Sequence, residues 1–246
     1  MKPSRKIDLS AFRPRIERME RRRFLKQGLS LGALSLLSGC TLKDEDAVDR
    51  LLFAMSRFND RVQAALFNPS KLAPTYSEAE VVTPFPFNAY YEEKEAPVIN
   101  GDDYRLKLSG LVADKRSWTL GELRALPQTS QITRLVCVEG WSAIGQWRGV
   151  PFRQFLERVG ADTTARHVGV ACADKYSTSI DMATALHPQT LLALDFSETK
   201  YGYPLRLRIP TKLGFKNPKF IAEIFVTNDN PGGYWEDKGY NWFSGS

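Results

Sequence analysis

Cys137 lies in the most informative segment of this chain, which reads Arg134-Leu-Val-Cys137-Val-Glu-Gly-Trp-Ser142. Strand-like apolar residues precede the cysteine and a glycine-containing turn follows it, so its thiolate could bind a soft metal. The chain has only two histidines and two other cysteines, too few for a metal cage built from protein side chains alone. A metal at Cys137 would therefore take most of its other ligands from a cofactor.

Other roles for Cys137 stay open from the residues alone. In an oxidising compartment Cys137 and Cys172 could form a disulfide. Cys172 could also be an inert thiol buried in a strand, which is common for cysteine. Disulfide, free thiol and metal ligand are thus all compatible with the sequence, whereas His167 and His187 are predicted to be structural.

The N-terminal 39 residues have the pattern of a targeting segment. A twin arginine, Arg21-Arg22, precedes the apolar run 28–37, which is too short to span a membrane. The run ends in Leu37-Ser-Gly-Cys40, which resembles a lipoprotein cleavage site. We predict a twin-arginine signal peptide at 1–39, a lipidated Cys40 and a periplasmic or other extracytoplasmic location; an uncleaved amphipathic anchor is the alternative. Twin-arginine export carries folded proteins, which suits a cofactor inserted in the cytoplasm.

The basic charge of the chain belongs to this segment. The chain carries a net charge of +6, and residues 1–39 contain ten Lys/Arg and three Asp/Glu, a net of +7. The remaining chain is therefore at 6 − 7 = −1, so the composition gives no argument for a nucleic-acid partner.

The rest of the chain divides into two predicted regions, 40–97 and 98–246. In the first, apolar spacing predicts a helix over 44–66, and a proline-rich stretch, 68–97, predicts an extended arm whose aromatic residues wrap a globular body. In the second, an irregular order of elements predicts an α+β fold with mixed sheets rather than a doubly wound sheet. Strands are expected at 104–109, 131–138, 167–173, 205–209 and 220–226, and short helices at 119–126 and 151–159.

Two polar clusters are candidates for ligand binding. Arg206 and Arg208 alternate along a strand and so leave the same face, and three lysines follow around Gly214. Such a set could hold a phosphate, although a solvated strand face is the common alternative. In the arm, the segment Asn88-Ala-Tyr-Tyr91-Glu92 could offer amide, hydroxyl and carboxylate groups to a polar heterocycle.

Together these motifs resemble the sulfite oxidase family of molybdopterin-dependent oxidoreductases, over roughly residues 88–246. The best match is Cys137-Val-Glu-Gly-Trp-Ser142, continued by Trp147-Arg-Gly-Val-Pro151. It looks closest to the branch that contains the periplasmic methionine sulfoxide reductase catalytic subunit. The resemblance implies that Cys137 is the catalytic molybdenum ligand and that the pterin dithiolene supplies two more sulfurs, which answers the shortage of protein ligands.

The resemblance also implies which residues contact the cofactor. Cys172 stands where the reductase has a threonine, and Tyr201 stands where the family has Asn or His, so both positions depart from the pattern. We expect Trp141, Tyr90 or Tyr201 to line the substrate pocket. The implied molybdopterin contacts are Asn88, Tyr91, Glu92, Cys172, Arg206, Lys212, Gly214, Phe215 and Lys216.

Departures from sulfite oxidases bear on the substrate. Phe87, Gly140-Trp-Ser142 and Leu194 stand where those enzymes carry arginine, other basic residues and tyrosine. A pocket with fewer cations favours a neutral or zwitterionic acceptor, so we expect two-electron reduction of an S-oxide or N-oxide. The alternatives are oxidation of a small sulfur compound, as in sulfite oxidases, and a lipoprotein that keeps the fold as a binding module without metal.

The same comparison bears on partners and domains. The chain ends at Ser246, too soon for the immunoglobulin-like domain of sulfite oxidases, so we expect none. No Cys-x-x-Cys-His haem motif occurs in the sequence. Electrons are therefore expected from a separate partner, a haem or quinone-linked membrane protein.

Overall fold

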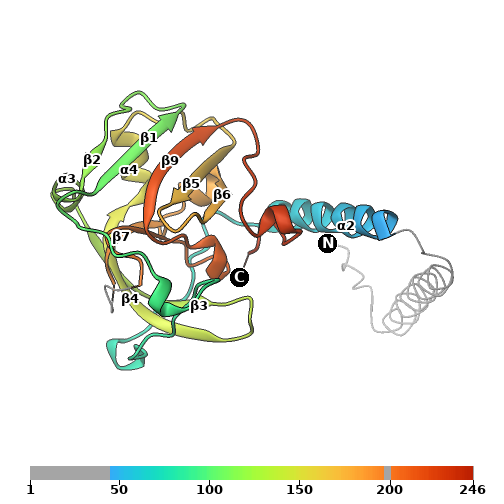
Figure 1. The fold of residues 1–246 in the computed structure, drawn as a ribbon, viewed down its shortest axis with the longest axis horizontal. Coiled ribbons are helices and arrows are strands. Elements are labelled where there is room, and N and C mark those ends of the chain that lie inside the picture. Colours follow the sequence, from blue (N-terminus) through green and yellow to red (C-terminus); the bar gives the residue numbers. More distant parts are fainter. Residues whose placement is uncertain (1–44, 197–200, 246) are drawn as a thin grey trace, which may run out of the picture. The chain divides into compact units, whose positions relative to one another are not determined.

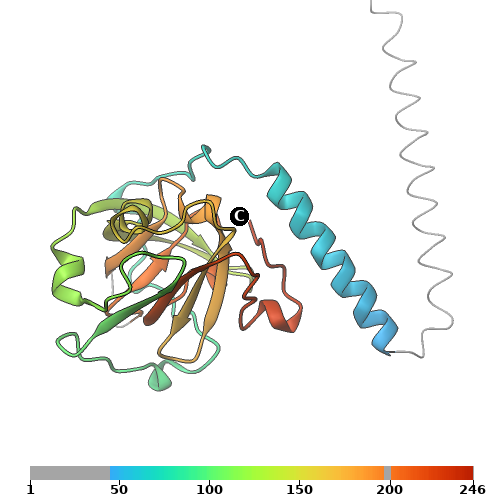
Figure 2. The same ribbon diagram turned by 90° about the horizontal axis from the view of Figure 1, so that it is seen from above.

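The computed structural model describes residues 45–196 and 201–245. The chain forms two compact units, 1–53 and 54–246. The predicted signal peptide and Cys40 lie outside the described residues. Helix α2 (Glu45–Leu66) is one uninterrupted helix (Figure 2) and confirms the helix predicted for this stretch. No helix in the described ranges combines the length and the apolarity needed to cross a bilayer.

The larger unit contains a five-stranded sheet in the order β2-β1-β9-β5-β6 (Figure 1). β1 runs parallel to β9, and the other neighbouring strands are antiparallel. Three of the strands agree with the sequence prediction to within two residues at each end. The five strands are β1 (Arg105–Gly110), β2 (Trp118–Thr119), β5 (His167–Cys172), β6 (Ser177–Asp181) and β9 (Ile221–Thr227).

A four-stranded antiparallel sheet carries Cys137. Its order is β3-β4-β7-β8, and β3 and β4 form a hairpin paired from Thr129↔Gly149 to Val136↔Ser142. Cys137 is the first residue after β3, so the hairpin fixes its position. The strands are β3 (Thr129–Val136), β4 (Ser142–Pro151), β7 (Leu191–Phe196) and β8 (Arg206–Arg208).

Short helices lie between the strands, which confirms the predicted α+β class. Thr119 caps α3 through a reciprocal capping box with Glu122, the arrangement expected of Thr three residues before Glu. The helices are α3 (Leu120–Arg124), α4 (Phe152–Arg158) and α5 (Met182–Ala185), with 3₁₀ turns η1 (Glu78–Glu80), η2 (Glu93–Glu95), η3 (Gly214–Lys216) and η4 (Glu236–Lys238).

The sequence prediction missed β2, β4, β6 and β7. For β4 the reason is its glycines, because Gly145 and Gly149 favour a turn in a local reading. In the structure a Cβ on Gly149 would lie 1.9 Å from the carbonyl oxygen of Leu192 on β7. Gly149 therefore permits close approach of two strands rather than ending one.

The arm at 68–97 packs on the four-stranded sheet. Thr75 forms a bridge with Thr133, and the amide of Tyr76 donates to the carbonyl of Ile132. Phe85 is buried edge-on to Trp147, with ring centroids 5.7 Å apart. This agrees with the wrapped arm that its aromatic residues suggested, because burying such rings stabilises the contact.

One large apolar core joins the two sheets and α4. It includes Leu106 and Ile224 from the five-stranded sheet, Leu192 and Leu207 from the four-stranded sheet, and Phe155 from α4. Leu135 and Ala143, at the end of the β3–β4 hairpin, pack instead in a smaller cluster with Phe85 and Trp147.

Candidate functional site

A tight turn holds Cys137 in place. The Cys137 amide donates to the carbonyl of Trp141 at 2.8 Å, and its own carbonyl accepts from the amide of Gly140 at 3.2 Å. Gly140 has φ +89°, a backbone conformation that side chains other than glycine adopt at a cost. The turn thus fixes the backbone of Cys137 at the end of the hairpin.

The Cys137 thiol is buried but not isolated. Asn88 Nδ2 lies 3.3 Å from the sulfur, and Glu139 Oε2 lies 3.7 Å from it. The same Glu139 oxygen accepts a hydrogen bond from Trp141 Nε1 at 2.9 Å. Burial raises the pKa of the Cys137 thiol, so the proton stays on sulfur at neutral pH.

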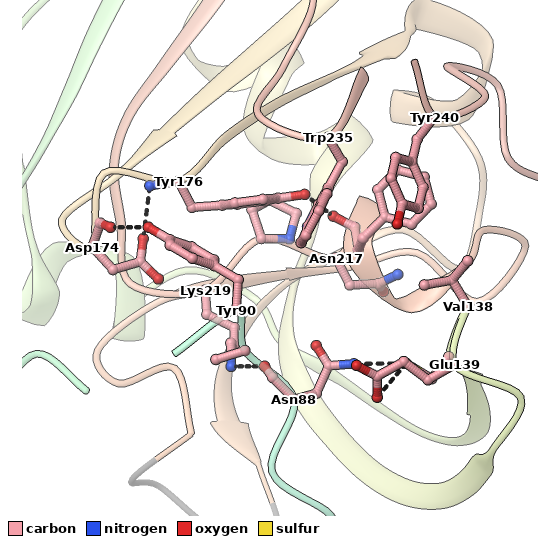
Figure 3. Close-up of a pocket in the computed structure, with 14 residues that line it drawn as sticks. Asn88, Tyr90, Val138, Glu139, Asp174, Tyr176, Asn217, Lys219, Trp235 and Tyr240 are labelled. Atoms are coloured by element: carbon pink, nitrogen blue, oxygen red, sulfur yellow. Dashed lines mark hydrogen bonds between the residues drawn. The ribbon is translucent and has the colours of Figure 1, made fainter. Parts of the chain in front are cut away.

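The sulfur lies on a cavity of about 240 Å³. Figure 3 shows Tyr176, Trp235 and Tyr240 on one side of it, facing Asn88 and Glu139 on the other. Aromatic rings dominate one wall, and polar groups from the arm and the hairpin form the opposite one. The lining residues that matter below are Asn88, Tyr90, Cys137, Glu139, Lys219 and Trp235.

Cys137 and Cys172 are both free thiols, so the disulfide that the sequence left open is not formed. Cys172 is buried in the main core and is not among the residues that line the cavity. Within the described residues no three His, Cys, Asp or Glu side chains come together as a metal site. A metal at Cys137 would need ligands from outside the chain.

The arm brings its predicted residues to different places. Asn88 lines the cavity, while the Tyr91 hydroxyl donates to Asp174 Oδ2 at 2.7 Å. Burial, and then Asp174, raises the pKa of Tyr91 well above its usual value, so the phenol stays protonated. Glu92 is exposed and pairs with Lys94 at 2.7 Å, away from the cavity lining.

Lys219 is a cavity residue to which the sequence assigned no specific role. Its ammonium group donates to the Asn88 carbonyl and lies 4.8 Å from the centre of the Phe87 ring. Burial, followed by the nearby Arg206, lowers the pKa of Lys219 to about 7. It belongs to the basic run after β8, so the signal was present in the charge pattern.

Arg206 and Arg208 leave the same side of β8, as their alternation predicted, but the solvated-face alternative is wrong. Both are buried, with guanidinium groups 4.7 and 4.8 Å from the centre of the Trp147 ring. Burial lowers the pKa of each to about 9. Arg206 Nη1 donates to the Tyr201 carbonyl at 2.9 Å, whereas its Nε has no acceptor in the part of the chain that is described.

Lys212 and Lys216 lie beside the C-terminal segment. Lys212 Nζ donates to the Phe243 carbonyl at 2.7 Å, and burial lowers its pKa to about 7. Lys216 forms a buried ion pair with Glu236. Neither ammonium is among the cavity-lining groups.

The glycine turn itself reaches the cavity. Phe215 lines it, and the Phe215 carbonyl accepts from the Tyr176 hydroxyl at 2.6 Å. A Cβ on Gly214 would lie 3.2 Å from Asn88 Nδ2, so the missing side chain leaves room for the arm. The structure thus brings together Asn88, Cys137, Gly214 and Phe215, and places the cations around them in separate groups.

Other wall residues were only partly foreseen. Of the three aromatic residues expected in the pocket, Tyr90 lines it, whereas Trp141 and Tyr201 do not. Tyr176, Trp235 and Tyr240 were not predicted to line it. They come from turns and loops, Tyr176 from one before β6 and the other two from either end of η4, and no local pattern indicates that they meet.

Comparison with known proteins identifies relatives of this chain. Residues 93–235 match the family described as the oxidoreductase molybdopterin binding domain. A protein of Azospira oryzae named "Putative protein-methionine-sulfoxide reductase subunit YedZ1" is 58% identical over 94% of this chain and 90% of its own length. The protein-methionine-sulfoxide reductase catalytic subunit MsrP of Ralstonia nicotianae is 29% identical over 68% of this chain and 60% of its own length.

Among solved structures, the sulfane dehydrogenase SoxCD from Paracoccus pantotrophus has a similar fold. Its TM-score is 0.51 at 20% identity, over 55% of this chain and 40% of that chain. The likeness concerns the fold alone. The family match covers more than half of the chain and begins one residue after Glu92, at the end of the arm segment that carries Asn88. The chain belongs to the sulfite oxidase family of molybdopterin-binding oxidoreductases.

Proposed function

We propose that the protein is an exported oxidoreductase that uses molybdenum bound to molybdopterin to remove an oxygen atom from an S-oxide. The observation that carries the proposal is the free, buried thiol of Cys137 on an aromatic-walled cavity. Sulfur ligands suit a soft metal, and the chain itself offers no other cluster of ligands in its described residues.

The residues around the cavity fit such a cofactor. Cys137 would hold the metal, and the absent side chain of Gly214 leaves space beside Asn88. Arg206 Nε, buried and without an acceptor among the described residues, is available to an anionic group such as a phosphate. Lys216 would have to exchange its partner Glu236 for that phosphate. Of the other contacts that the resemblance implies, Phe215 lines the cavity, whereas Tyr91, Glu92, Cys172 and Lys212 lie outside its lining and would contact only parts of the cofactor that extend beyond it.

When bound, the cofactor supplies the two-electron chemistry, and the protein orients the reactants. The overall reaction consumes an S-oxide, two electrons and two protons, and gives a sulfide and water. Tyr90 and Trp235 would pack against the alkyl groups and sulfur of the substrate, a contact that thioethers make well. The carboxylate of Glu139 on the opposite wall disfavours a doubly charged anion such as sulfite.

Relatives of this chain are named protein-methionine-sulfoxide reductases. Methionine sulfoxide within polypeptides is therefore the first substrate to test. Electrons would come from a separate membrane-bound redox protein carrying haem or using quinone. Lipid on Cys40 would keep the enzyme at the extracytoplasmic surface after twin-arginine export.

Enzyme purified from the exported fraction should oxidise a reduced dye when methionine sulfoxide is added, at a rate proportional to bound molybdenum. Sulfite with an oxidised dye should give little turnover. Dye reduction by sulfite without any sulfoxide-dependent oxidation would contradict the proposed direction and substrate.

A further inference from the structure

One side of helix α2 exposes an apolar stripe. Met55, Phe58, Val62 and Leu66 recur every three or four residues, which places them on one side of a helix. Phe58 is 62% exposed and Leu66 is 79% exposed. Amphipathic helices of soluble domains normally bury such a stripe, so something outside the described chain is expected to cover it.

A different side of α2 faces the body of the larger unit. Asp60 Oδ1 accepts from the amide of Phe243 at 2.6 Å, and Gln63 Oε1 accepts from the amide of Gly245 at 3.2 Å. Just beyond the helix, Phe67 packs edge-on against Phe243, with centroids 5.4 Å apart. Helix α2 itself thus contacts the C-terminal segment through polar groups, and its large apolar side chains are exposed.

The apolar surface extends beyond these four residues. Leu51 and Leu52, one turn earlier on the same helix, are exposed as well. After the helix, Leu72 is exposed, and it lines with Leu66 a groove of about 600 Å³. From Leu51 to Leu66 these exposed large side chains extend over about four and a half turns of helix, more than scattered surface residues would.

We propose that this stripe lies on a lipid bilayer, with α2 parallel to the membrane surface. The stripe is opposed by a polar side, and charges on residues 48–66 nearly balance, with three arginines and two aspartates. This composition is typical of a helix that sits at the interface without crossing it. Because the charges balance, binding should depend on apolar contact rather than on anionic lipid.

The position of α2 shortly after Cys40 favours a bilayer over other partners for the stripe. Cys40 precedes Glu45 by five residues, which at full extension span no more than about 18 Å. A lipid on Cys40 therefore keeps the start of α2 close to the headgroups. The proposal extends the membrane attachment proposed above, but the stripe itself should bind lipid whether or not Cys40 is acylated.

The test compares two labelled positions on α2 in cofactor-loaded protein from the exported fraction. Phe58→Cys places a polarity-sensitive fluorophore on the stripe, and Ala64→Cys, also exposed, places it about a third of a turn away around the axis. Both changes are made in a Cys40→Ser background, and Cys137 and Cys172 are buried, so the label goes to the introduced thiol. The protein is mixed with phosphatidylcholine vesicles, with and without brominated acyl chains.

We expect bromine to quench the label at 58 about threefold more than the label at 64, and a second change, Met55→Glu, to abolish the difference. Equal, weak quenching at both positions, or no association with vesicles, would overturn the proposal. So would protection of position 58 only in a dimer of this chain or only with a membrane protein added. Molybdenum content and sulfoxide reduction are measured on the same samples, so failure of the proposed enzyme activity is seen separately.

Discussion

Asn88 Nδ2 lies 3.3 Å from the sulfur of Cys137, across 49 positions of sequence. The contact ties the wrapping arm to the tip of the β3–β4 hairpin. The Asn88 carbonyl also accepts from Lys219, so one residue connects the thiol to the basic segment after β8. The cavity therefore depends on the arm as much as on the sheet.

Removing this amide should weaken metal retention. In Asn88→Ala the sulfur loses a hydrogen-bond donor that orients it, and loss of such outer contacts typically lowers metal affinity about 10- to 100-fold. We expect the variant to lose molybdenum faster than the wild type during dialysis. Elemental analysis of the dialysed proteins measures this loss. Asn100→Ala, which loses a surface hydrogen bond to Asp103, should retain metal like the wild type. Equal retention in both variants would contradict the role of Asn88.

The charge of Glu139 should control which substrates enter. Glu139→Gln removes a negative charge from the cavity wall while keeping an oxygen for Trp141 Nε1. We expect the ratio of kcat/KM for sulfite to that for a neutral sulfoxide to rise about tenfold, equivalent to about 1.4 kcal/mol. Glu157→Gln, an exposed change on α4, is the control. An unchanged ratio would show that Glu139 does not exclude anions.

Lys212 should make the cofactor-free protein more stable at alkaline pH. Burial lowers the pKa of Lys212 in the folded state to about 7, far below its usual value of 10.5. The unfolded chain then binds more protons between these two values, so the free energy of unfolding rises with pH across this window. For Lys212 alone we expect a gain of about 2 kcal/mol from pH 7 to pH 9.

The measurement is urea unfolding of the cofactor-free protein at both pH values. Lys212→Met should remove this part of the pH dependence, whereas Lys115→Met, at an exposed position, should preserve it. A wild-type slope in Lys212→Met would show that its ammonium is not the group responsible.

Two glycines offer a matched test of the fold. Gly149→Ala places a Cβ 1.9 Å from the Leu192 carbonyl oxygen and should separate β4 from β7, at a cost of about 2–4 kcal/mol. Gly121→Ala, in helix α3, meets no atom closer than 4.0 Å and should be neutral or stabilising by about 0.5–1 kcal/mol. Thermal unfolding compares the two; similar effects would mean that β4 and β7 are not packed as described.

The elements with strong local signals were predictable. The short helix predicted from Thr119, the apolar spacing of α2 and the alternation at Arg206 and Arg208 all agree with the structure. Strand β4 was not predictable, because Gly149 permits close approach to Leu192, which is distant in the sequence. Strand glycines of this kind cannot be distinguished from turn glycines by local pattern.

Site residues with distinctive chemical motifs could be predicted from the sequence, whereas site residues whose position depends on packing could not. Cys137 and Asn88 were identified from their motifs and do meet. The lysines were expected to act together, but Lys219 lies on the cavity while Lys216 pairs with Glu236. Long-range packing decides which partner each lysine contacts, and no local sequence pattern predicts that packing.

Elemental analysis of the purified protein tests the central claim most directly. We predict close to one molybdenum per wild-type chain, its loss in Cys137→Ala, and its retention for the most part in Cys172→Ala, whose sulfur is buried outside the cavity lining. Wild-type protein without molybdenum from cells with an intact cofactor pathway, or metal that persists in Cys137→Ala, would contradict the account.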